Sequence, residues 1–162
     1  MSPRFADRLE RILRRLLETT LMVVLAAMAL ICFLEVMLRY GLGSSFGWYD
    51  EFTGYLLVWL TFLGAVLAQL EEKHIGVGDL AGHFGPRWRR AAAFATLGLM
   101  LVLHILLLYY GGQLAIRFLT DRAITLPVPM GIIYAVIPLS AVLMLALLMI
   151  QLGRLLRSEP ES

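Results

Sequence analysis

Residues 91–116 read AAAFATLGLMLVLHILLLYYGGQLAI, which is a run of 26 residues without an Asp, Glu, Lys or Arg side chain. Residues 52–70 and 123–153 form two further uncharged runs, and a fourth apolar stretch extends from Thr19 to about Tyr40. Because a helix rises about 1.5 Å per residue, about 20 residues cross a hydrocarbon core about 30 Å thick, and each stretch meets that length. Backbone groups in lipid must bond within the chain, and these continuous runs do not alternate as barrel strands do. The pattern predicts an all-α integral membrane protein with four transmembrane helices.

The charged residues mark the limits of the expected helices. We expect a single membrane domain over residues 1–162, with spans at 19–40, 51–71, 90–117 and 130–153. Residues 3–18 should form an N-terminal amphipathic interfacial helix, because apolar residues recur there at spacings of three and four with arginines on the opposite face. Such a helix would contact membrane lipids. The alternative is that residues 3–18 simply continue the first span.

The composition excludes most soluble classes of protein. Apolar residues make up 60% of the chain and charged residues only 16%, below the roughly 25% that is usual in soluble domains. The connecting segments are too short for a catalytic domain, and no nucleotide-binding loop, catalytic triad or paired-carboxylate site is present. We therefore expect that the chain is not an enzyme. Nucleic-acid binding is disfavoured because the basic residues follow one face of the membrane.

Candidate cofactor ligands are few. His104 is the only histidine inside an expected span, whereas a b-type haem commonly takes two axial histidines. Cys32 is the only cysteine, so it cannot form an intrachain disulfide. His74 and His83 lie in a connecting segment and form no metal-ligand pattern with Cys32. We predict no cofactor and no metal site, with His104 as a hydrogen-bonded packing residue.

Basic residues are distributed unevenly between the two sides of the membrane. Of the 14 Lys and Arg residues, 11 lie in the N-terminal segment, the connection after the second span or the C-terminal tail. The other three are Arg39, Arg117 and Arg122. Cytoplasmic segments carry the excess of Lys and Arg, which predicts that both termini are cytoplasmic and that residues 41–50 and 118–129 lie outside. The first span has no small-residue cleavage site at its end, so we expect it to be retained.

Several residues within the spans suggest contacts between helices or with a partner. Glu35 and Arg39 are four residues apart and share a helix face. Either they form a buried pair that docks to a partner or another helix, or both lie in the headgroup zone with Arg39 reaching water. Small residues of the second and third spans, including Gly54, Gly64 and Gly98, should permit close helix packing. In the fourth span, Pro138 should produce a kink.

Three short motifs, in this order and spacing, resemble the small membrane subunit (Q, or DctQ-type) of TRAP transporters, the tripartite ATP-independent periplasmic carriers. EVMLRY at 35–40 closes the first span, WYDE at 48–51 leads into YLLVWLTFLGA at 55–65, and HIGV occurs at 74–77. The similarity in size, number of spans and orientation covers nearly the whole chain. One departure is Gly78-Asp79, where the family often has an acidic residue directly after the valine.

The resemblance implies a small, non-catalytic membrane subunit of a sodium-coupled, binding-protein-dependent secondary transporter for organic acids. The chain would lie in the bacterial inner membrane, brace the large (M type) TRAP membrane subunit and help the periplasmic substrate-binding protein to dock. Glu35, Arg39, Trp48 and Glu51 would contribute to the outer end of the subunit interface, and His74 to the inner connection.

Two other classes remain open at this point. A self-sufficient small exporter would work as a homo-oligomer, but the chain lacks the mid-span carboxylate that proton coupling would need. A membrane anchor subunit of a respiratory enzyme would bind haem or quinone, and the single intramembrane histidine, His104, disfavours it.

Overall fold

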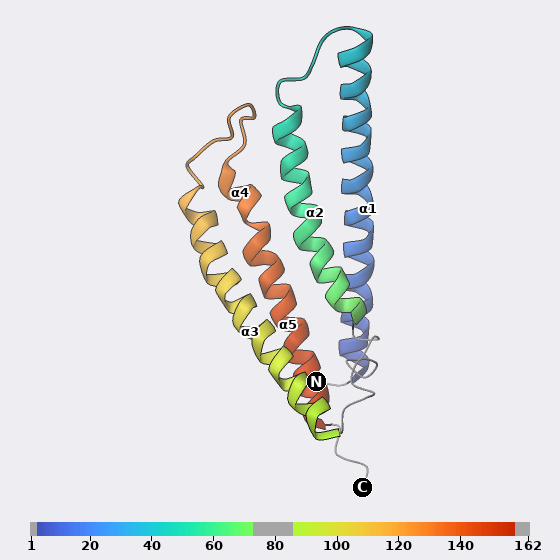
Figure 1. The fold of residues 1–162 in the computed structure, drawn as a ribbon, viewed down its shortest axis with the longest axis vertical. Helices are drawn as coiled ribbons and strands as arrows, with labels where there is room; N and C mark the ends of the chain where they lie inside the picture. The colour runs from blue at the N-terminus through green and yellow to red at the C-terminus, as the bar shows by residue number, and fades with distance from the viewer. Residues whose placement is uncertain (1–2, 73–85, 158–162) are drawn as a thin grey trace.

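The computed structural model describes residues 3–72 and 86–157. These residues form the helices α1 (Pro3–Gly41), α2 (Tyr49–Glu72), α3 (Pro86–Arg117), α4 (Met130–Tyr134) and α5 (Val136–Arg157) (Figure 1). Within these described ranges, four segments are long and apolar enough to cross a membrane, namely Glu10–Gly41, Tyr49–Glu71, Phe94–Arg117 and Met130–Gly153. No strand is formed in the described ranges, where the only β-type pairing is an isolated bridge between Arg122 and Pro129. The prediction of an all-α protein with four spanning helices is confirmed.

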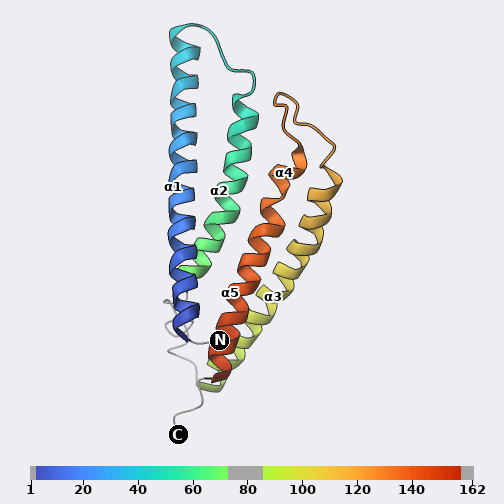
Figure 2. The same ribbon diagram turned by 180° about the vertical axis from the view of Figure 1, so that it is seen from behind.

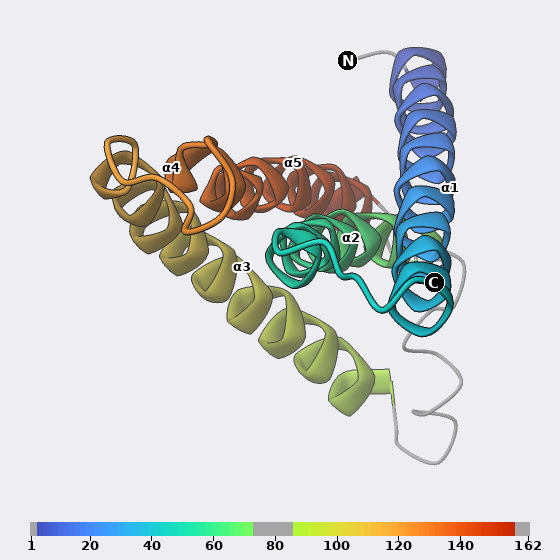
Figure 3. The same ribbon diagram turned by 90° about the horizontal axis from the view of Figure 1, so that it is seen from above.

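The helices form an open row instead of a closed bundle. α1 packs along α2, α2 packs against α5, and α5 packs against α3 (Figure 1). Figure 2 shows the same order from behind, and the view along the long axis in Figure 3 shows α1 and α3 on opposite sides with α2 and α5 between them. Burial follows this order: in an apolar stretch of 18 residues, 39% of the residues are buried in the span over α4 and α5, compared with 6% in the α1 span and 11% in the α3 span. The two outer helices therefore leave most of their surface uncovered by this chain.

The apolar core lies mainly between α2 and α5. Its central side chains, Val66 of α2 and Val136 of α5, are fully buried. The remaining members come from α1, α2 and α5: Leu17, Leu63, Leu70, Met144 and Leu147. Only Leu17 of this cluster belongs to α1. Because α1 packs mainly against α2, the first helix is attached to the rest of the molecule through α2.

The N-terminal amphipathic segment and the first span form one continuous helix. α1 contains 39 residues, which corresponds to a length of about 58 Å and is about twice the thickness of the hydrocarbon core. No turn separates residues 3–18 from residues 19–40. This continuity agrees with the alternative that residues 3–18 simply continue the first span. The depth of residues 3–18 in the membrane stays a prediction.

The fourth span is interrupted at Ala135, between α4 and α5. Pro138 lies three residues further on and has no N–H to offer to the carbonyl of Tyr134, which its ring also crowds. The backbone bonds from Ala135 to Gly131 (3.0 Å) and from Leu139 to Ala135 (3.2 Å) continue across the interruption. The helix thus lacks one backbone bond at the proline and continues on both sides of it.

The close approaches between helices involve glycines other than the expected ones. A Cβ atom at Gly54, Gly64 or Gly98 would meet nothing within 4 Å, so these glycines make no close helix contact among the described residues, and the prediction that they permit close packing stays a prediction. A Cβ at Gly111 would lie 2.5 Å from the Ile137 side chain, and one at Gly131 would lie 2.5 Å from the carbonyl oxygen of Ala115. Close packing therefore occurs where α3 meets α4 and α5.

Candidate functional site: two loops held by carboxylates

The predicted interface residues of α1 and α2 gather at one end of the molecule. This end, called the loop end below, carries residues 42–48 between α1 and α2 and residues 118–129 between α3 and α4 (Figure 1). Glu35 and Arg39 belong to the last turns of α1, Trp48 directly precedes α2, and Glu51 lies in its first turn. His74, the fifth predicted residue, lies outside the described residues.

The Glu35 carboxylate holds the first loop against α1. Its side chain is almost completely buried, with 2% of the residue exposed. It accepts hydrogen bonds from the Ser45 hydroxyl and from the Phe46 backbone N–H (3.1 Å). Arg39 lies 3.4 Å from the same carboxylate and keeps 56% of its side chain exposed. Glu35 and Arg39 therefore pair with each other, and Glu35 also binds the loop of its own chain.

A reversal of the backbone after α1 makes this contact possible. The N–H groups of Leu42 and Ser44 both donate to the Leu38 carbonyl, at 3.0 and 3.3 Å, which satisfies a carbonyl at the end of the helix. Gly43 between them has a φ of 64°, a left-handed conformation that glycine adopts without the steric cost of a Cβ. The loop consequently turns back, and Ser45 reaches the buried carboxylate.

The Glu51 carboxylate holds the second loop against α2. It accepts hydrogen bonds from the backbone N–H groups of Ile124 (2.8 Å) and Thr125 (2.6 Å) and from the Thr125 hydroxyl. The Tyr55 hydroxyl, one turn further along α2, donates to the same carboxylate and lies 3.3 Å from the sulfur of Met130. Glu51 thus connects the start of α2 to a loop more than 70 residues away in the sequence.

Backbone bonds give the second loop a fixed shape of its own. The Ala123 N–H donates to the Val128 carbonyl (3.0 Å), and the Met130 N–H donates to the Asp121 carbonyl (2.8 Å). The N–H of Gly131, at the start of α4, donates to the Phe118 carbonyl (2.8 Å), and a Cβ at Gly131 would lie 2.9 Å from the Cα of Leu119, two residues after the end of α3. The loop therefore closes as a narrow turn on top of α3 and α4.

Trp48 packs within the chain. Its ring lies 5.3 Å from the Phe46 ring and 5.7 Å from the Phe52 ring, the second contact being edge-on at 81°. Next to it, the Tyr49 hydroxyl lies 3.4 Å from the Cys32 sulfur. These contacts fasten the end of the first loop to α1 and to the first turn of α2.

The sequence did not indicate the loop partners of the two carboxylates. Ser45 and Thr125 donate to Glu35 and Glu51 respectively, but each lies in an irregular segment where sequence spacing does not indicate which residues meet. The Gly131 contact was also missed. Its only signal is a glycine two residues after the Pro127-Val128-Pro129 stretch, in the first turn of the expected helix.

Two buried polar side chains of the spans, His104 and Gln69, bond to other groups of the chain. The His104 Nδ1–H donates to the Met100 carbonyl (2.6 Å), and Nε2 lies 2.8 Å from the Met144 sulfur. Gln69 donates to the Met144 carbonyl at 3.4 Å, so α2 and α3 both contact α5 at this methionine. His104 is therefore a hydrogen-bonded packing residue, as predicted. Within the described part of the chain, no group of His, Cys, Asp and Glu side chains could hold a metal ion.

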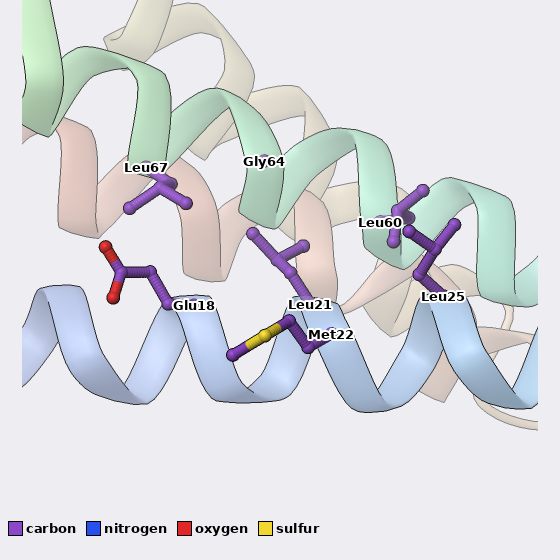
Figure 4. Close-up of a pocket in the computed structure, with 7 residues that line it drawn as sticks. All are labelled: Glu18, Leu21, Met22, Leu25, Leu60, Gly64 and Leu67. Atoms are coloured by element: carbon purple, nitrogen blue, oxygen red, sulfur yellow. The ribbon is translucent and has the colours of Figure 1, made fainter.

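Toward the end opposite the loops, α1 and α2 are joined by an ion pair, and an open groove runs from there toward the middle of the two helices. Arg14 contacts Glu18 at 2.7 Å and reaches Glu71 of α2 at 3.0 Å. Figure 4 shows the groove, with Glu18 at one end of it. Its other lining residues are apolar or glycine: Leu21, Met22, Leu25, Leu60, Gly64 and Leu67. The groove is open to the side, as expected of a surface that faces lipid or another membrane protein.

Comparison with known proteins identifies the family. Residues 28–158 match the family model described as "Tripartite ATP-independent periplasmic transporters, DctQ component". A TRAP transporter small permease protein of Haemophilus influenzae is 31% identical over 145 residues, which cover 89% of each chain. A C4-dicarboxylate TRAP transporter small permease protein, DctQ, of Vibrio cholerae is 30% identical over 99 residues, or 61% of this chain and 43% of the Vibrio protein. With its four spanning helices, the chain belongs to the DctQ family of TRAP transporter small permease subunits, which are not enzymes.

Proposed function

We propose that this chain braces the large membrane subunit of a sodium-coupled TRAP transporter and helps a periplasmic substrate-binding protein to dock on it. The observation that carries the proposal is the open row of helices, which leaves the outer helices α1 and α3 largely uncovered. A chain that transported alone would need a polar path through its own helices. The described helices instead use their buried polar groups, such as Gln69 and His104, for contacts with α5.

The small residues that pack against nothing in this chain support a membrane partner. Gly54 and Gly64 on α2 and Gly98 on α3 all have open space at the position of a Cβ. Small residues let the backbones of neighbouring membrane helices approach closely. We therefore assign these uncovered faces of α2 and α3, with the exposed side of α1, to contacts with the large subunit and with lipid.

The distribution of basic residues supports one orientation of the chain in the membrane. Eleven of the 14 Lys and Arg residues belong to the N-terminal segment, the connection after the second span or the C-terminal tail. Because cytoplasmic segments carry the excess of Lys and Arg, this distribution supports a cytoplasmic location for both termini in a bacterial inner membrane. The loop end then faces the periplasm.

Cysteine labelling tests this orientation. In a Cys32→Ser background, the Ser44→Cys variant should react with a membrane-impermeant thiol reagent in intact spheroplasts, whereas the Arg8→Cys variant should react only after lysis. The reverse pattern would contradict the orientation.

The predicted interface residues have different roles. Glu35 and Glu51 act through the loops that they hold, because their carboxylates are occupied by loop groups. Arg39 keeps more than half of its side chain exposed, so it is available for a partner's acidic group. Trp48 supports the first loop from within the chain. His74 remains assigned to the cytoplasmic connection.

The transported substrate is proposed to be an organic acid. The support is the similarity to the Vibrio cholerae protein, which is named as a C4-dicarboxylate TRAP transporter small permease protein. The chain itself would not select the substrate, since its described residues contribute two carboxylate-held loops and a packed interior. Substrate choice is assigned to the binding protein and the large subunit.

Reconstitution tests this function directly. The large subunit would be placed in proteoliposomes with and without this chain, and uptake of a labelled dicarboxylate would be measured under an inward sodium gradient with the binding protein added. We expect uptake only when all three proteins and the gradient are present. Uptake by this chain alone would contradict the proposal and support a self-sufficient small transporter.

A further inference from the structure

We propose that Ile124, at the tip of the second loop, is an apolar anchor on which the periplasmic binding protein docks. This inference rests on the proposed function and names a contact residue for the docking step. Ile124 is 94% exposed, whereas its neighbour Ala123 is 8% exposed. The loop thus buries the small apolar side chain and presents the large one.

The backbone that carries Ile124 is held from two sides. On one side, its own N–H and that of Thr125 donate to the Glu51 carboxylate at 2.8 and 2.6 Å. On the other side, the Ala123 N–H donates to the Val128 carbonyl at 3.0 Å. A loop that is already ordered loses little conformational freedom when a partner binds, which favours binding. A mobile loop would be enough to insert one apolar side chain among lipid headgroups. The fixed backbone of this loop therefore favours a folded protein as the partner of Ile124.

The surroundings of Ile124 favour a soluble protein over the large membrane subunit. The loop lies beyond the ends of the spans that flank it, which finish at Arg117 and start again at Met130. Asp121 and Arg122, on the same loop, are exposed and of opposite charge. A central apolar side chain with a polar, charged margin is the usual anatomy of a protein–protein interface, in which a few residues carry most of the binding energy.

The test uses the full complex of this chain with the large subunit, in lipid nanodiscs, and the purified binding protein of the same transporter. The dissociation constant is measured by surface binding for the wild type, Ile124→Asp, Ile124→Val and Leu42→Asp. Leu42→Asp is the matched control, because Leu42 is 76% exposed on the first loop. We expect Ile124→Asp to weaken binding at least about tenfold, and the two other variants to stay within about twofold of the wild type.

The outcomes separate this inference from the proposed function. An unchanged dissociation constant for Ile124→Asp would overturn the anchor, as would an equal loss in Leu42→Asp, which would show a general effect of negative charge. Loss of the large subunit from the Ile124→Asp complex would also overturn it, by assigning Ile124 to the membrane interface. If instead the wild-type chain forms no complex or binds no binding protein, the proposed function itself fails.

Discussion

The two loops at the loop end are each held by one glutamate, but they differ in how much else supports them. The first loop is bonded at its start to the Leu38 carbonyl and packed at its end through Trp48, but its middle is held to α1 by the Glu35 bonds to Ser45 and Phe46. The second loop has bonds between its own backbone groups, such as those joining Ala123 to Val128, in addition to Glu51. The difference suggests that the first loop opens when its carboxylate is removed, whereas the second only loosens.

The largest effect is expected where the second loop joins the helices. In Gly131→Ala, the new Cβ would meet the Ala115 carbonyl oxygen at 2.5 Å and the Leu119 Cα at 2.9 Å. Because both atoms belong to the backbone, neither can move away by changing a rotamer, and we expect a loss of about 1–3 kcal/mol in stability. Thermal unfolding in detergent measures it.

Gly112→Ala is the matched control for this substitution, because a Cβ at Gly112 meets nothing within 4 Å. It should be neutral or slightly stabilising, since alanine favours a helix over glycine. Equal melting temperatures for the two variants would show that the close approach at Gly131 does not support the second loop.

Removing the first carboxylate should open the first loop. In Glu35→Ala, the Ser45 hydroxyl and the Phe46 N–H lose their acceptor, and a donor without a partner is costly when it stays out of water. Hydrogen exchange over residues 42–48 should become faster by about tenfold or more. Exchange over residues 118–129 should not change, and this region serves as the internal control.

Removing the second carboxylate should produce a smaller and more local change. In Glu51→Ala, Ile124 and Thr125 lose their acceptor, but the bonds from Ala123 to Val128 and from Met130 to Asp121 remain. Faster exchange should therefore be confined to Ile124 and Thr125. Exchange that accelerates across the whole of 118–129 would mean that Glu51, and not the backbone, gives this loop its shape.

The smallest effect is expected at the exposed cation. Arg39→Gln removes an ion pair at 3.4 Å whose arginine side chain is 56% exposed, and water screens such pairs strongly. Exchange in the first loop should stay close to that of the wild type. A change as large as that of Glu35→Ala would show that the pair, more than the hydrogen bonds to Ser45 and Phe46, holds the loop.

The sequence predicted the spans well, because span length and the exclusion of charge from lipid depend on local composition alone. It also identified His104 as a packing residue, since a single intramembrane histidine has few other roles. It was less informative about packing within the row. Gly54, Gly64 and Gly98 were expected at helix contacts, but composition does not reveal which face of a helix meets its own chain and which meets a partner.

The loop contacts could not be predicted for a different reason. Glu51 binds residues 124 and 125, and Glu35 binds residues 45 and 46 across an irregular turn. Helical periodicity gives no information on such contacts, because they depend on where each loop turns. The acidic residues could be singled out from their positions at span ends, but their role as holders of loops required the structure.

The composition of the complex in its native membrane tests the central claim most directly. The tagged chain would be extracted in mild detergent and weighed intact by native mass spectrometry. The account predicts one copy of this chain with one large polytopic membrane protein. A homo-oligomer of this chain, with no other membrane protein, would contradict it.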